Sequence, residues 1–80
     1  MLVNYKVKAI QGRSFTYYGD VYYLNGDYWT TVKLEEGLTD WWVKYYAKQN
    51  LMKQVAKTMF GRIRTWKRIY LDVADLEVVR

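Results

Sequence analysis

Apolar and polar residues alternate through most of the first 35 residues, which is the period of a half-buried β-strand. The alternation predicts strands over residues 2–10, 14–24 and 27–35. The dipeptide Asn25-Gly26 lies between the second and third strands, and it favours a two-residue type I′ turn because both residues tolerate positive φ. The chain is therefore expected to begin as an antiparallel meander.

The predicted turn fixes which residues face each other across the second and third strands. Tyr23 is expected opposite Tyr28, and Tyr17 opposite Leu34. The interruption at Gly19-Asp20 indicates a bulge or a second tight turn. Four residues are expected to share the apolar side of the second strand across this interruption: Phe15, Tyr17, Val21 and Tyr23. The side away from the core is expected to be polar but aromatic, with Tyr18, Tyr22 and Trp29 among Lys6, Lys8 and Lys33.

One amphipathic helix follows the meander. Thr39 is a suitable N-cap, Asp40 places a carboxylate in the first turn, and Gly61 is a typical residue after the last turn, so the helix is expected to end at Phe60. Helical spacing predicts one broad apolar face, formed by Trp41, Trp42, Tyr45, Met52, Val55, Ala56, Met59 and Phe60. A narrower stripe, formed by Val43, Ala47 and Leu51, is expected to point elsewhere, where the C-terminal segment is available to cover it.

The C-terminal segment alternates from Ile69 and slips in phase at Ala74-Asp75. This pattern predicts two short strands or one bulged strand. A helical interpretation competes with it, but the enrichment in β-branched and aromatic residues favours a sheet. The predicted fold class is α+β: a small antiparallel sheet in the order βββαβ, or βββαββ, with one helix packed on one face. Residues 1–80 are expected to form a single domain.

The sequence contains no cysteine and no histidine. This excludes disulfide scaffolds, Cys/His zinc sites, thiol nucleophiles and catalytic triads with an imidazole base. The acidic residues are too dispersed for a metal-dependent phosphodiesterase, so we expect no enzymatic activity, no metal and no cofactor. No apolar run suits a signal peptide or a membrane helix, so we expect a cytoplasmic protein without a membrane partner.

Residues 44–68 contain eight basic residues and no acidic residue, although the whole chain carries a net charge of only +5. Such like charges repel each other, and stability alone favours intervening Glu residues. An anionic partner, most commonly phosphate, is therefore expected at Lys44, Lys48, Lys53, Lys57, Arg62, Arg64, Lys67 and Arg68. The alternative is that the lysine stems merely flank the apolar helix face.

Aromatic residues make up 19% of the chain, so some must lie outside one small core. Tyr18, Tyr22 and Trp29, interleaved with lysines on the outer sheet face, form a candidate platform for stacking nucleic-acid bases. One alternative is that they pack against the C-terminal strands or a partner subunit, or simply strengthen cross-strand pairs. Another is that they bind a different protein.

Two functions from different classes follow from these features. The first is a non-enzymatic nucleic-acid-binding domain that contacts DNA or RNA through residues 44–68 and the aromatic sheet face. The second is a small phage-type accessory or inhibitor protein that binds a host protein through its aromatic and basic surface. Either function is compatible with a homo-oligomer.

Overall fold

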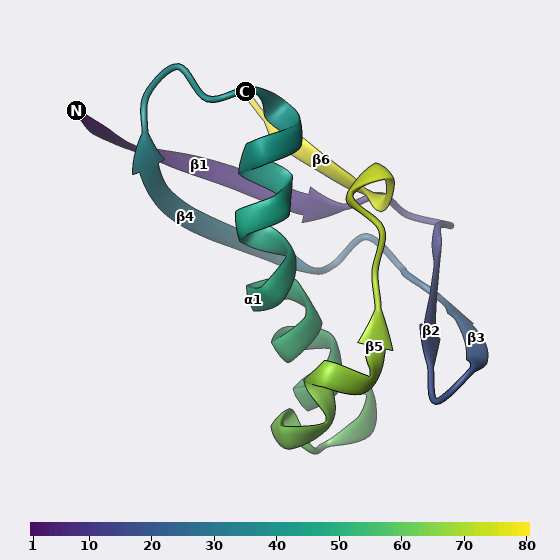
Figure 1. Cartoon of the computed structure of the whole chain (residues 1–80). Helices are drawn as coiled ribbons and strands as arrows, with labels where there is room; N and C mark the ends of the chain where they lie inside the picture. The colour runs from purple at the N-terminus through teal and green to yellow at the C-terminus, as the bar shows by residue number, and fades with distance from the viewer.

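The structure, a computed structural model of all 80 residues, confirms the α+β class (Figure 1). Strands β1 to β4 precede a single long helix, α1, and two further short strands follow it. The bounds are β1 Leu2–Ala9, β2 Ser14–Tyr17, β3 Asp20–Tyr23, β4 Trp29–Glu35, α1 Asp40–Phe60, the 3₁₀ helix η1 Ile63–Arg68, β5 Ile69–Tyr70, the 3₁₀ turn η2 Val73–Asp75, and β6 Leu76–Val79. Figure 1 shows α1 crossing in front of the strands.

The strands form two antiparallel sheets, ordered β4-β1-β6 and β3-β2-β5. These sheets are two halves of one bent structure, because β1 continues into β2 and β3 continues into β4. Paired residue numbers add to 37 in both halves, as in Leu2 with Glu35 and Ser14 with Tyr23. The first four strands are therefore the two arms of a single long hairpin, bent at residues 10–13 and 24–28.

The hairpin turn lies at Tyr18-Gly19. Tyr17 pairs with Asp20, which leaves two residues in the loop. Their φ angles are 51° and 84°, so both are positive, as a type I′ turn requires. Of the two interpretations of this interruption, the tight turn is thus the one observed.

The predicted hairpin at Asn25-Gly26 is wrong, and so are the residue pairs derived from it. This dipeptide lies at the bend between the sheets, where the Asn25 side chain accepts a hydrogen bond from the Asp27 N–H (3.0 Å). Gly26 has φ of 84°, and a Cβ added there would lie 3.0 Å from the Cβ of Gln11 on the other arm. Asn and Gly are therefore suited to this position because the chain bends there, not because it reverses.

The position of the turn also corrects the faces of β3. Phe15 pairs with Tyr22, so Tyr22 and not Val21 shares its face. Val21 and Tyr23 point to the outside and are well exposed, contrary to the predicted apolar side. In β1 and β4 the predicted alternation is correct, and Val7 and Val32 face the core.

Helix α1 begins and ends where the sequence predicts, but its buried face is different in the N-terminal half. The stripe expected to point elsewhere is the one that packs on the sheets, and the buried residues are Val43, Ala47, Leu51, Met52, Val55 and Ala56. Trp41, Trp42 and Tyr45, predicted to be buried, are exposed, and so is Met59 near the C-terminal end. The small side chains of Val43 and Ala47 allow the helix to approach β4, β6 and β1, which three bulky rings would prevent.

The C-terminal segment forms two short strands separated by a turn, as predicted. Ile69 pairs with Tyr17, and Leu76 pairs with Ala9, so this segment lies along the β1–β2 arm. The phase slip is real, since Ile69 and Leu76 are both buried on either side of η2.

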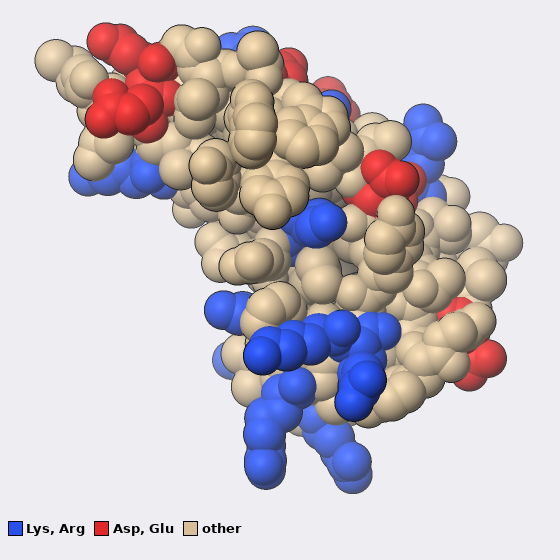
Figure 2. All heavy atoms as spheres, in the orientation of Figure 1, with Lys and Arg blue, Asp and Glu red and all other residues tan.

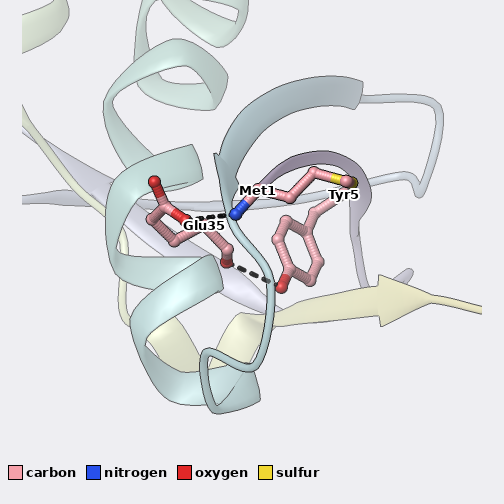
Figure 3. Close-up of polar contacts among 3 residues, drawn as sticks. All are labelled: Met1, Tyr5 and Glu35. Atoms are coloured by element: carbon pink, nitrogen blue, oxygen red, sulfur yellow. Dashed lines mark hydrogen bonds and ion pairs between the residues drawn. The ribbon is translucent and has the colours of Figure 1, made fainter.

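Both ends of the chain are tied to the fold. The Met1 amino group forms an ion pair with the Glu35 carboxylate (3.0 Å), and the Tyr5 hydroxyl donates a hydrogen bond to the Glu35 carbonyl (3.0 Å; Figure 3). The Arg80 side chain is ion-paired with Asp40 at the start of α1. These contacts hold the outer ends of β1, β4 and β6 near the N-terminal end of the helix.

Candidate nucleic-acid interface

The eight basic residues of segment 44–68 extend along α1 and into η1. Lys44, Lys48, Lys53 and Lys57 lie on the helix, Arg62 follows its end, and Arg64, Lys67 and Arg68 lie in η1. Figure 2 shows Lys and Arg side chains gathered at the lower end of this face, over the C-terminal end of α1 and the segment after it. We call these eight residues the basic cluster.

No member of the basic cluster is paired with an acidic side chain. The ion pairs within 4.0 Å are Met1 with Glu35, Lys8 with Glu77 and Arg80 with Asp40, all outside the cluster. The eight positive charges therefore lack internal compensation and attract anions from solution.

Aromatic rings, rather than carboxylates, position several of these cations. The Nζ atoms of Lys53 and Lys67 lie 5.0 and 5.7 Å from the centre of the Trp66 ring. Arg68 lies 5.8 Å from the ring of Tyr18 at the hairpin tip. Exposed cation–π contacts contribute only about 0.5–1 kcal/mol each, but they orient a charge without neutralising it.

The way in which α1 ends determines where the exposed arginines of the cluster lie. Gly61 has φ of 69°, and its N–H bonds to the Lys57 carbonyl, which terminates the helix. The chain then turns, and the Thr65 hydroxyl donates to the Arg62 carbonyl (2.8 Å). An open hollow follows this turn, lined by Gly61, Arg62, Ile63, Arg64 and Thr65.

The stems of three lysines also cover apolar surface. Lys44, Lys48 and Lys53 are half-buried, whereas Lys57 and the cluster residues of segment 62–68 are exposed. For those three lysines both interpretations hold together: the aliphatic stem packs beside the core, and the ammonium group reaches solvent.

The three aromatic residues predicted on one sheet face do not gather. Tyr18 lies at the hairpin tip, and Tyr22 faces the helix, with its ring 5.2 Å from that of Phe60. The prediction that Tyr22 lies on the side away from the core is therefore wrong. Trp29 does lie on the outer face of β4, with the Nζ atoms of Lys6 and Lys8 4.7 and 5.4 Å from its ring centre.

A different aromatic group, not predicted as a site, is exposed on α1. Trp41, Trp42, Tyr45 and Tyr46 are 50%, 46%, 44% and 49% exposed, and we call them the helix aromatic cluster. The stripe of small apolar residues spaced by four, Val43 and Ala47, was the sequence signal for it. This stripe marks the sheet-facing side, so Trp41 and Tyr45 fall on the opposite side of the helix and Trp42 and Tyr46 flank the stripe.

Two further observations concern the acidic side chains. No group of three or more acidic side chains converges to hold a metal ion. Asp75 has a pKa raised above its ordinary value, first by burial and then by the nearby charge of Asp72. It lies in η2 at the bend, away from the basic cluster.

Comparison with known proteins does not assign a function to this surface. No helix has the length and apolar character needed to span a membrane. The chain matches no protein-family model, no curated protein and no solved structure at a significant level.

Proposed function

We propose that this chain is a non-enzymatic, cytoplasmic nucleic-acid-binding domain whose contact surface is the basic cluster. The observation that carries the proposal is the set of eight cations in 25 consecutive residues, none of them paired with a carboxylate. Each lysine or arginine that neutralises a phosphate releases condensed counterions, which favours binding to a polyanion.

The distribution of charge supports a polymer rather than a single small anion. The cations extend along α1, with Lys44 and Lys48 on one side of the helix and Lys53 and Lys57 on another, and they continue into η1. They are therefore spread over a long surface. The exposed arginines of the cluster offer planar, bidentate donors that suit phosphate oxygens. A phosphodiester backbone presents charges at regular intervals along such a surface.

Salt dependence tests the proposal. If the basic cluster contacts about four to six phosphates of a duplex, log K should fall linearly with log salt, with a slope between about −3.6 and −5.4. The measurement is a titration of labelled duplex and single-stranded DNA and RNA at several salt concentrations. Failure of the wild-type chain to bind any polynucleotide at low salt would overturn the proposal.

A second candidate is binding to a host protein, as expected of a phage-type accessory or inhibitor protein. An exposed patch on the outer face of β3-β2-β5 favours it. Thr16 pairs with both Val21 and Tyr70, so these two residues flank it, and both are more than half exposed. Tyr is enriched in interface hot spots. Tyr70→Ala should abolish recovery of a specific partner in a pull-down and leave polynucleotide affinity unchanged if this function is the correct one.

A further inference from the structure

We propose that the helix aromatic cluster is a stacking platform for unpaired bases, so that the preferred ligand is single-stranded nucleic acid. This inference rests on the proposed function, because it names the substrate class of the same surface. It assigns the stacking role to α1, not to the outer sheet face from which the sequence predicted it.

The four rings of the cluster contact one another and are open to solvent. Trp41 and Tyr45 are stacked, with ring centres 5.5 Å apart and planes 13° apart. Trp42 and Tyr46 are stacked at 6.1 Å and 29°. The two stacks are offset by one residue and lie nearly perpendicular to each other, with 88° between the planes of Trp41 and Trp42 and 82° between those of Tyr45 and Tyr46. Together they present π-faces and edges at the surface. Such platforms accept any base, because every base has a π-face.

The charges beside the cluster are complementary to a phosphate backbone. Lys48 holds its Nζ atom 5.7 Å from the Tyr45 ring centre, and Lys44 lies one turn earlier on the helix. Asp40 is the only acidic residue of α1, and it is paired with Arg80. A base stacked on the rings would thus have cations within reach of its phosphate and no free carboxylate on the helix to repel it.

The helix aromatic cluster is continuous with the basic cluster along α1. From Trp41 to Lys57 the helix rises by roughly 24 Å, at about 1.5 Å per residue. Figure 2 shows a mostly uncharged surface over the N-terminal half of α1, with a small blue patch within it, and Lys and Arg side chains gathered below it on the same face. A single strand lying along α1 would meet rings first and cations next. A duplex would meet the same cations but keep its bases inside.

The composition of the surface favours bases over a lipid bilayer. The cluster contains only Trp and Tyr, and the next exposed helix residues are Gln49 and Asn50. A helix that lies in a membrane interface also uses Trp, but it combines Trp with Phe and Leu along one apolar face. On α1 the aliphatic side chains are buried against the sheets instead.

The test compares rings with aliphatic side chains at the same positions. The double variant Trp42→Leu/Tyr45→Leu keeps apolar bulk and helix propensity but removes two π-faces, whereas Trp42→Phe/Tyr45→Phe keeps the rings. Binding is measured to oligo(dT) of about 16 nucleotides, within the range of single-strand site sizes, and to a duplex of equal length. A second control, Tyr23→Leu/Tyr70→Leu, removes two exposed rings from the outer face of β3-β2-β5.

We expect the Leu double variant to raise the Kd for oligo(dT) by about fivefold or more, and the Phe double variant to change it by no more than about twofold. Duplex affinity should be the same in all variants. If the Leu double variant melts at a lower temperature, Tyr46→Leu compared with Tyr46→Phe gives the same contrast at a single exposed position.

Four results would overturn the inference. Duplex binding by the wild type with unchanged oligo(dT) binding by the Leu variant would remove the stacking role and leave the proposed function intact. Loss of oligo(dT) binding in the Tyr23/Tyr70 control as well would show that the effect is not specific to α1. Binding of the wild type and the Leu variant to phosphatidylserine vesicles, but not to oligo(dT), would identify a lipid surface instead. Absence of all polynucleotide binding by the wild type would overturn both proposals.

Discussion

The ring of Phe60, the last residue of α1, lies stacked on the ring of Tyr17 in β2, with centres 3.9 Å apart and planes 12° apart. Phe15 and Tyr22 surround Phe60 with edge contacts. This group joins the C-terminal end of the helix to the β2–β3 part of the hairpin. The basic cluster begins on the helix and continues beyond this joint, so its shape depends on the contact.

Replacement of Phe60 by Ala should destabilise the domain. Half-burial of the ring and its stacking on Tyr17 suggest a loss of about 2 kcal/mol in the free energy of unfolding. Met59→Ala, at a neighbouring position that is 42% exposed, should cost less than about 1 kcal/mol. Denaturant titration measures both values. Equal effects of the two substitutions would contradict the role of Phe60 as the joint between helix and hairpin.

The two glycines with the same φ of 84° should respond differently to an added methyl group. Gly19→Ala introduces only backbone strain, because nothing lies within 4 Å of the new Cβ, and should cost about 1 kcal/mol. Gly26→Ala adds a contact of 3.0 Å with the Cβ of Gln11 to the same strain, so its melting temperature should fall further. A smaller effect at Gly26 than at Gly19 would show that the two arms are farther apart at the bend than in this structure.

Removal of three arginines from the basic cluster should weaken binding to every polynucleotide. Arg62→Gln/Arg64→Gln/Arg68→Gln should reduce the magnitude of the salt slope by up to about three units without changing the melting temperature much. The matched control removes the same charge from the outer face of β4-β1-β6, by changing Lys6, Lys8 and Lys33 to Gln. If the control reduces the slope equally, the contact surface is not the basic cluster.

The raised pKa of Asp75 predicts a pH-dependent effect on stability. A carboxyl group whose pKa is raised by folding binds more protons in the folded state, so its contribution to stability falls as pH rises through the folded pKa. Asp75→Asn should therefore raise the melting temperature at about pH 7, and the gain should shrink toward about pH 3, where Asp75 is protonated in both states. A gain that is independent of pH would assign the effect to packing and not to charge.

Local sequence predicted the features that local interactions determine. The alternation in β1, the ends of α1 at Asp40 and Phe60, and the phase slip before Leu76 are all confirmed. Each depends on residues that are neighbours in the chain, such as a terminating glycine or an alternating pair. These signals operate whatever the rest of the fold does.

Local sequence signals could not decide which of two candidate turns the chain uses. Both Tyr18-Gly19 and Asn25-Gly26 offer a glycine with positive φ, and turn propensity favours the second. The structure uses the first, because β1 then pairs with β4 and also with β6, which buries Val7 and Ala9 completely. Strand pairing between residues far apart in sequence therefore outweighs the stronger local turn propensity of Asn25-Gly26.

The face of α1 was mispredicted for a similar reason. Trp41, Trp42 and Tyr45 form the largest group of bulky aromatic side chains that the helical spacing placed on one face. At the close distance between helix and sheets, however, only the small side chains of Val43 and Ala47 fit. The size of the side chains, which a hydropathy pattern does not describe, determines which face of α1 packs on the sheets. The same mistake concealed the helix aromatic cluster as a candidate site.

The single register of the bent hairpin has a consequence for the order in which the chain folds. Direct pairing of Leu2 with Glu35 would close a long flexible loop, whereas the pairs next to Tyr18-Gly19 close a very short one. Because the register is the same on both sides of the bend, pairing that begins at the turn can extend outward to β1 and β4 without realignment. The N-terminal residues are then among the last to join, and β6 completes the sheet against a β1 already in place. Folding kinetics should show this directly, with substitutions in β2–β3 slowing folding and substitutions near Met1 mainly speeding unfolding.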